Sequence, residues 1–483
     1  IDSIKRVEIL SALEEKLPEL PAVAPEILGG LKTLEQIVAT IGGFETSAGP
    51  AHPASSALSL PDANAVPEPI LQAVEHSNGD LDRQVVRWVE KQLNADQPIS
   101  LPANRKVIIT DDASGLSAAI AEELDRRGIH TVLVSADILR HKTSLPPASG
   151  LILVVDPDAA LETDQLKSLF GLTRHLAPDL NQSAEEAAAI FASVIRMDGA
   201  FGFNGGGVGY PLQGALAGLV KTAALEWQTV HCRALDVAPA WHDLSAVAGA
   251  IVKELLSADP QAPVEIGLHQ DTRCVPELIP VSIAAEQCGS PSFEPEGVLV
   301  VTGGARGVTA AATAALASAT RLNLALLGRS PTPEPAPHWL EGLEDETAVK
   351  KAILANQFNG KRPSPRQLES AYRKHHANLE ISATLAKIAA TGSTARYYPV
   401  DVRDRRAVDR VLKTVRSSQG PIHGIIHGAG VLEDRLIVDK TDKQFDQVFA
   451  TKVEGMRHLL SASESDPLTH LVVFSSIAAR LGN

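Results

Sequence analysis

Apolar residues follow two different patterns along this chain. Short runs of apolar and β-branched residues predict buried strands, and stretches with apolar residues every three or four positions predict amphipathic helices. Between residues 84 and 285 we expect strands over 106–110, 131–135, 151–155 and 232–237, with helices over 115–127 and 215–226. This alternation is typical of an α/β fold built on a parallel sheet.

A second α/β pattern fills the carboxyl-terminal part of the chain, with strands expected over 298–301, 322–327, 395–400, 424–426 and 471–474 and a helix over 309–319. Residues 331–394 interrupt this pattern as an insertion. It contains a proline-rich turn over 331–337 and a helical run over 368–391. The helical run carries a basic cluster at 373–376, which we interpret as a solvent-exposed face.

A glycine-rich turn follows the first strand of the second pattern: Thr302-Gly303-Gly304-Ala305-Arg306-Gly307. Strand, glycine turn and helix form a dinucleotide-binding unit, because glycines let the backbone approach a pyrophosphate and the helix N-terminus offers N–H groups. Arg329 ends the second strand, where a basic residue favours the 2′-phosphate of NADPH, and Arg306 is a second candidate phosphate contact. A lone glycine pair is equally consistent with a plain strand–helix connection. The residues at the ends of the later strands are therefore needed to favour a dinucleotide site.

Three later strands also end in residues suited to a cofactor site. They are followed by Asp401-Val402, by Gly428-Ala429-Gly430 and by Ser475-Ser476. Asp401 and Val402 stand at the expected adenine edge, and the small residues of the second turn let a cofactor lie against the backbone. Functional groups at the carboxyl ends of successive parallel strands are expected of a doubly wound sheet. We therefore expect a Rossmann-like, NADPH-binding sheet over 291–483.

The first α/β pattern lacks such a turn. Its first strand is followed by Asp111-Asp112-Ala113-Ser114-Gly115, whose two carboxylates would repel a pyrophosphate. We interpret residues 84–290 as a degenerate Rossmann-like half that binds no nucleotide, with an active second dehydrogenase as the less favoured alternative. The glycine-rich stretch over 204–209 follows no clear strand and is interpreted as a loop.

The composition argues against several classes of partner and site. The net charge of −14 argues against nucleic acid as a partner. The three cysteines, Cys232, Cys274 and Cys288, have no metal-like spacing, and their sparse use suggests a reducing cytoplasm. No apolar run reaches the length of a membrane span, so we expect none.

Residues 297–483 resemble the ketoreductase domain of type I polyketide synthases, a branch of the short-chain dehydrogenases. The motif Thr451-Lys452-Val453-Glu454-Gly455-Met456 matches the lysine motif of that branch, with Lys452 24 positions before Ser476. The resemblance implies reduction of a carrier-tethered β-ketoacyl thioester, with Ser476 bonding the reacting oxygen and Lys452 lowering the pKa of a tyrosine. Leu432-Glu433-Asp434 resembles a motif that sets the hydroxyl configuration, with Asp434 matching and the middle residue departing from it.

The family's catalytic tyrosine would stand at position 489, whereas the printed sequence ends at 483 and its four tyrosines all precede Ser476. We therefore expect a truncated reductase that is inactive as given. Residues 84–290 resemble the structural subdomain of modular ketoreductases. A non-catalytic carrier and docking scaffold is the alternative.

Residues 1–10 closely resemble an acyl carrier motif, most like the carrier repeats of polyunsaturated fatty acid synthases. The resemblance makes Ser3 the attachment site of phosphopantetheine, at a helix start where free N–H groups suit a phosphodiester; an ordinary N-cap is the simpler interpretation. Residues 1–41 then form a partial carrier domain, and 42–83 an Ala-, Pro- and Ser-rich linker. Implied partners are other carrier and synthase domains, a phosphopantetheinyl transferase and, in a full enzyme, a second copy of the chain.

Overall fold

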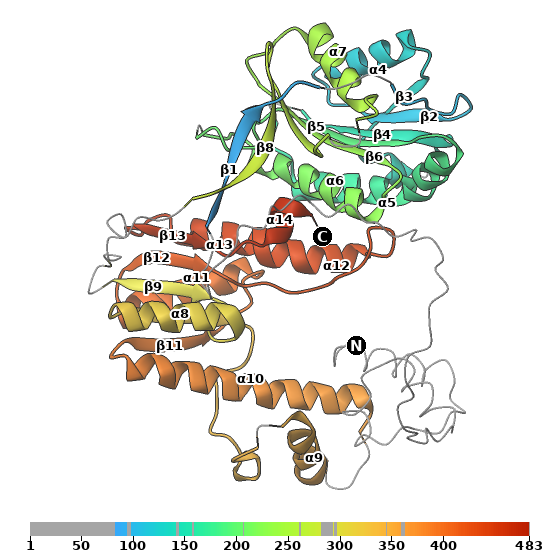
Figure 1. Cartoon of the computed structure of the whole chain (residues 1–483). Helices are drawn as coiled ribbons and strands as arrows, with labels where there is room; N and C mark the ends of the chain where they lie inside the picture. Colours follow the sequence, from blue (N-terminus) through green and yellow to red (C-terminus); the bar gives the residue numbers. More distant parts are fainter. Residues whose placement is uncertain are drawn as a thin grey trace, which may run out of the picture. The chain divides into compact units, whose positions relative to one another are not determined.

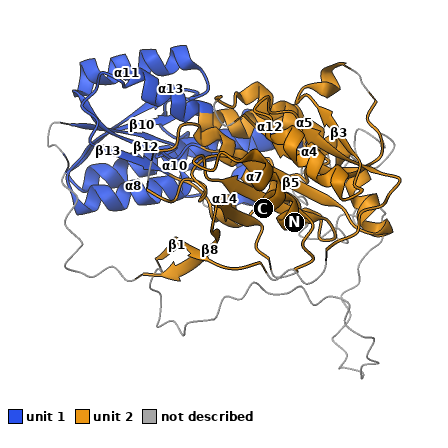
Figure 2. Ribbon diagram, turned by 90° about the horizontal axis from the view of Figure 1, so that it is seen from above, with its two compact units in different colours: residues 1–79, 291–429, 454–473 blue, residues 80–290, 430–453, 474–483 orange. Residues whose placement is uncertain are grey.

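The computed structural model describes residues 83–482 except 94–97, 142–143, 157–158, 206, 260–261, 282–292, 294–296, 344 and 359–362. The expected carrier segment, the linker, Ser3 and Cys288 lie outside the described residues. Two compact units are present, coloured separately in Figure 2. The described parts of unit 2 fall within 80–290, 430–453 and 474–483, and those of unit 1 within 291–429 and 454–473.

Unit 2 is built on an eight-stranded sheet in the order β1-β8-β7-β6-β5-β4-β2-β3. Strands β2 to β7 pair in parallel, whereas β8 pairs antiparallel with both β1 and β7. The strands are β1 (Gln84–Glu90), β2 (Lys106–Thr110), β3 (Thr131–Val134), β4 (Ala148–Val154), β5 (Ile190–Ile195), β6 (His231–Val237), β7 (Glu265–Leu268) and β8 (Arg273–Pro280).

Helices cover both faces of this sheet (Figure 1). Neighbouring strand residues point to opposite faces, so Ile108 joins the core beneath α5 (Thr163–Glu186) and α6 (Gly214–Glu226). Val107 and Ile109 join the core beneath α4 (Leu116–Arg126) and α7 (Leu244–Leu255). The short helices α12 (Asp442–Phe449) and α14 (Ile477–Leu481) belong to the same unit and contact α5 and α6, respectively.

Unit 1 is built on a five-stranded parallel sheet in the order β11-β10-β9-β12-β13. The chain order reverses between β9 and β12, and ligands of open α/β sheets bind at such a reversal. The strands are β9 (Val298–Thr302), β10 (Asn323–Gly328), β11 (Thr394–Pro399), β12 (Ile422–His427) and β13 (His470–Val473). The helices are α8 (Gly307–Ala319), α9 (Glu346–Gln357), α10 (Pro365–Ala390), α11 (Arg405–Gln419) and α13 (Gly455–Ala462).

The helices of unit 1 divide between the two faces of its sheet. Val408 and Leu412 of α11 and Leu459 of α13 are buried in one core with the strands. Helix α8 packs on α10, and α8 lies on the opposite side of the sheet from α11 and α13 in Figure 2. The insertion supplies α9 and α10, which share a small core around Ile353.

The expected α/β fold with Rossmann-like parallel sheets is confirmed. The structure also bears out a loop at 204–209, whose described residues form neither helix nor strand. Among the described residues, no helix is long and apolar enough to cross a membrane.

Candidate functional site

The ends of β9 and β12 are tied together at the reversal of strand order. Thr302 Oγ1 lies 2.8 Å from Nδ1 of His427, and both side chains are buried. The backbone N–H of Ala429 donates to Thr302 Oγ1 (3.1 Å), and that of Gly428 donates to the Thr302 carbonyl (3.0 Å). The threonine hydroxyl therefore fixes the small-residue turn against the glycine turn.

Two glycines allow these turns to approach each other. Gly303 has a φ of +73°, and a Cβ on it would lie 2.8 Å from the carbonyl oxygen of Gly428. A Cβ on Gly428 would lie 2.5 Å from Cγ2 of Thr309. Gly307 differs, because a Cβ there would meet nothing within 4 Å. The turn thus has no room for a side chain at Gly303, whereas the space beside Gly307 is open.

The open side lies at the N-terminus of α8. Arg306 is the residue before this helix, and its side chain makes no capping hydrogen bond. A helix of 13 residues presents N–H groups and the positive end of its dipole at this point. The uncapped helix end and the glycine cradle fit the pyrophosphate of a dinucleotide.

Charged residues surround the ends of β10 and β11. Arg329 is exposed directly after β10. The Arg403 guanidinium, with an N–O distance of 2.6 Å to the Asp401 carboxylate, holds the pKa of that carboxyl below its usual range despite partial burial. The charge of Arg329 acts in the same direction on Asp401, so the two expected cofactor residues lie within electrostatic reach. The next residue, Val402, is buried.

The insertion reaches this site, which the sequence did not indicate. Arg306 forms an ion pair with Glu380 of α10, with an N–O distance of 2.6 Å. The Tyr397 hydroxyl donates to the carbonyl of Ser330 (2.8 Å) and thereby fixes the chain after β10. Arg306 and Glu380 are 74 positions apart, and nothing in the local sequence pairs them.

The expected catalytic residues belong to unit 2. Lys452 is exposed on a single π-helical turn, Ala450–Glu454. A Cβ on Gly430 would lie 3.8 Å from Lys452 Nζ, so these two expected site residues are brought together. Ser476 follows β13 and precedes α14, and its Oγ accepts from the N–H of Ala478 (3.2 Å). Asp434 is exposed in the loop before α12.

The segments that carry these residues are anchored within unit 2. The N–H of Ile437 donates to Glu226 (2.8 Å), which pins the loop of Asp434 to α6. Lys221 Nζ donates to the carbonyls of Ala479 (2.7 Å) and Arg480 (3.1 Å) at the end of α14. The degenerate half thus holds the helix that begins after Ser476.

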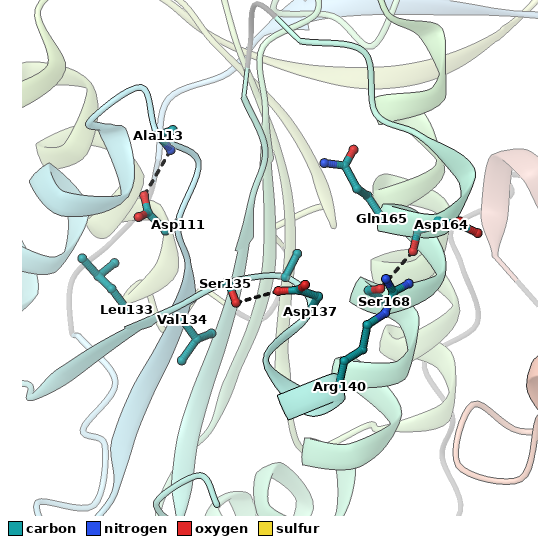
Figure 3. A pocket seen from close by; sticks show the side chains of 11 residues that line it. Asp111, Ala113, Leu133, Val134, Ser135, Asp137, Arg140, Asp164, Gln165 and Ser168 are labelled. Carbon is teal, nitrogen blue, oxygen red and sulfur yellow. Dashed lines mark hydrogen bonds between the residues drawn. The ribbon is translucent and has the colours of Figure 1, made fainter. Parts of the chain in front are cut away.

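The turn after β2 differs from the cradle after β9 in one respect that matters for ligands. The buried carboxylate of Asp112 accepts from the backbone N–H (3.1 Å) and the hydroxyl (2.7 Å) of Ser117 in the first turn of α4. An internal anion therefore occupies the helix end where a pyrophosphate would bind. The cavity beside this turn, of about 480 Å³, is lined by Asp111, Asp137 and Arg140 among others (Figure 3).

Part of this chain is similar to a known domain family. Residues 363–483 match the family model of the KR domain. The whole chain is 31% identical to part of a polyunsaturated fatty acid synthase protein of Thraustochytrium sp. and covers 18% of that protein. Polyketide synthase PksN of Bacillus subtilis is 24% identical over 56% of this chain, and the aligned part covers 4% of PksN.

Solved ketoreductase structures share the fold. A-type ketoreductases from a modular polyketide synthase align with a TM-score of 0.58 and 20% identity, over 83% of this chain and 75% of theirs. An N-terminal ketoreductase from a macrolactin assembly line aligns with a TM-score of 0.56 and 18% identity, over 83% and 76%. Residues 363–483 therefore match the KR domain model, the chain shares its fold with solved ketoreductase structures, and it spans less than a fifth of the two curated relatives.

Proposed function

We propose that this chain is the ketoreductase part of a multifunctional polyketide or polyunsaturated fatty acid synthase and reduces a carrier-tethered β-ketoacyl thioester to the β-hydroxyacyl form with NADPH. The observation that carries the proposal is the glycine cradle at the reversal of strand order, with an uncapped helix in front of Gly307 and Arg329 at the next strand end. These residues match what a phosphorylated dinucleotide needs.

Each expected site residue has a role in this reaction. NADPH, when bound, supplies the hydride to the keto carbon. The cradle glycines and Ala429 hold the cofactor against the backbone, and Asp401 and Val402 line its adenine edge. The hydroxyl of Ser476 donates to the ketone oxygen and stabilises the charge that develops there. The Lys452 ammonium lowers the pKa of the proton donor, and Asp434 sets the face of the ketone that is reduced.

The proton donor is the part of this mechanism that the printed residues do not supply. The four tyrosines precede Ser476, and the expected tyrosine position is 489. Without a general acid the rate falls by about 10²–10⁴-fold. A polypeptide that ends before position 489 should thus bind NADPH but reduce ketones at a very low rate. A longer chain that includes position 489 should be active, and Lys452→Ala or Ser476→Ala should remove most of that activity.

Titration with both nicotinamide cofactors tests the proposal directly. NADPH should bind more tightly than NADH, and Arg329→Ala should reduce that preference. A charge-assisted contact to phosphate changes affinity about ten- to a hundredfold. Equal binding of the two cofactors, or an unchanged preference in Arg329→Ala, would argue against the assignment. Failure to bind either cofactor would favour a carrier and docking scaffold instead.

We also propose that Ser3 carries phosphopantetheine, so that the partners are a phosphopantetheinyl transferase and the other domains of the same synthase, in a homo-oligomer in the cytoplasm. A carrier domain that includes Ser3 should gain the mass of the phosphopantetheine arm when it is incubated with such a transferase. No gain in mass after incubation of such a domain with a transferase would refute this assignment.

A further inference from the structure

A cavity of about 400 Å³ in unit 1 joins the insertion to the cofactor cradle. Arg306 of the glycine turn and Ser330 after β10 line this cavity. The loop 331–337 and the helix α10, through Lys374 among others, line it as well. Two structural parts that are far apart in the sequence thus enclose one space.

The wall formed by the insertion is held in place. The backbone N–H of Glu334 donates to Oδ1 of Asn378 (2.8 Å), and Nδ2 of Asn378 donates to the carbonyl of Glu334 (2.8 Å). Four prolines, Pro331, Pro333, Pro335 and Pro337, restrict the same loop. The loop is therefore fixed against α10 at the level of the cavity.

The cations of this cavity differ in their partners. Arg306 is paired with Glu380, and Arg373 is paired with Glu369 (2.8 Å). Lys374 is exposed and forms no ion pair in the part of the chain that the structure describes. It is thus the cation that can meet an incoming anion without first breaking an ion pair.

The position of the cavity indicates which anion would enter it. In this type of fold the pyrophosphate lies at the N-terminus of the helix after the first strand, and the adenosine ribose lies at the end of the second strand. Here those two points are Arg306 and Ser330, which both line the cavity. A group on the ribose 2′-oxygen would therefore point toward it.

We propose that Lys374 is a specificity-determining residue, which binds the 2′-phosphate of NADPH from the insertion, together with Arg306. The inference rests on the proposed function, since it concerns the same cofactor. Arg373, Lys374 and His376 are exposed, as the sequence-based interpretation of the basic cluster expected, and Arg373, Lys374 and His375 in addition line the cavity.

The test compares Lys374→Ala with Lys387→Ala in the 1–483 chain. Both lysines are exposed on α10, but Lys387 lies outside the cavity. Fluorescence titration should show the dissociation constant for NADPH raised about three- to tenfold in Lys374→Ala, and that for NADH unchanged. Adenosine 2′-monophosphate and adenosine 5′-monophosphate, which lack nicotinamide, should show the same contrast. Lys387→Ala should match the wild type.

Removal of the opposing carboxylate gives a prediction of opposite sign. Glu380→Gln leaves Arg306 without its anionic partner, so both cofactors should bind more tightly, and NADPH by the larger factor because it carries the additional phosphate. Equal loss of both cofactors in Lys374→Ala, or equal effects of Lys374→Ala and Lys387→Ala, would overturn the inference. If Lys374→Ala is neutral while Arg329→Ala removes the NADPH preference, the inference fails and the proposed function stands. If the wild type binds neither cofactor, both fail.

Discussion

Replacement of Glu265 by glutamine should destabilise unit 2 and release the helix that begins after Ser476. The side chain of Glu265 is 6% exposed on β7 and lies between two cations. Lys221 Nζ is 2.8 Å from its carboxylate, and Arg480 of α14 forms an ion pair with the other oxygen. Loss of the charge leaves two cations facing each other in a largely buried site.

The expected magnitude follows from the burial of this cluster. Removal of one partner from a buried ion pair costs about 3–5 kcal/mol. Lys221 retains the carbonyls of Ala479 and Arg480 as partners, which places Glu265→Gln near the lower end, at about 3 kcal/mol. For a unit of this size, the melting temperature should fall by roughly 6–12 °C.

Urea unfolding followed by circular dichroism measures the stability change, and hydrogen exchange of the α14 amides measures the local release. Asp446→Asn is the matched control, because the Lys167–Asp446 ion pair likewise anchors a short helix of unit 2, joining α12 to α5. Unlike the Glu265 cluster it is partly exposed, with Lys167 27% and Asp446 49% exposed. An exposed pair of this kind contributes about 0–1 kcal/mol. A Glu265→Gln variant as stable as Asp446→Asn, with unchanged exchange in α14, would refute the reasoning.

Three further predictions concern single side chains. Asp112→Ala should lower the free energy of unfolding by about 1–2 kcal/mol, because the first turn of α4 loses its acceptor; unchanged urea unfolding would contradict that role. Burial would raise the pKa of Glu369, but Lys350 and Arg373 outweigh burial and hold it below the ordinary value of 4.5. The stability that Glu369 contributes is thus present above pH 4.5 and is lost as the pH falls through the lowered pKa. The difference in melting temperature between wild type and Glu369→Gln should therefore shrink in acid. A difference independent of pH would be inconsistent with this role. Burial raises the pKa of Cys232 to about 12, so its thiol should react slowly. Peptide mapping after iodoacetamide treatment of the native chain should find Cys274 labelled before Cys232. The reverse order would show that Cys232 is accessible.

Strands with contiguous β-branched residues could be located from the sequence. The structure has β2 at Lys106–Thr110, as expected, and β9 at Val298–Thr302, one residue longer than expected. In contrast, β5 (Ile190–Ile195) was missed. An alanine-rich stretch joins it to the end of α5 without glycine or proline, so no turn signal separates helix from strand. The antiparallel pairing of β1 with β8 was also missed, since it joins segments about 190 residues apart.

The site shows the same division between local and distant information. The glycine cradle could be predicted because its requirement for a positive φ and close backbone approach is met within a few consecutive residues. The partners of Arg306 and Asp401 could not be predicted from the sequence, for two different reasons. Arg403 is two residues from Asp401 but looks like any surface arginine, whereas Glu380 depends on how α10 packs on α8.

The two strand–turn–helix units of this chain share an architecture but differ at the N-terminus of the helix. After β9 the helix end is left uncapped, so an external anion can accept from its N–H groups. After β2 the Asp112 carboxylate already accepts from Ser117, and a phosphate would have to displace it beside a second carboxylate, Asp111. What the degenerate half keeps is a packing surface, since Glu226, Lys221 and Glu265 bind the segments that bear Asp434 and Ser476. In a chain that includes position 489, substitutions at these three positions should therefore impair turnover more than NADPH binding, because the cradle belongs to unit 1 and the anchors to unit 2.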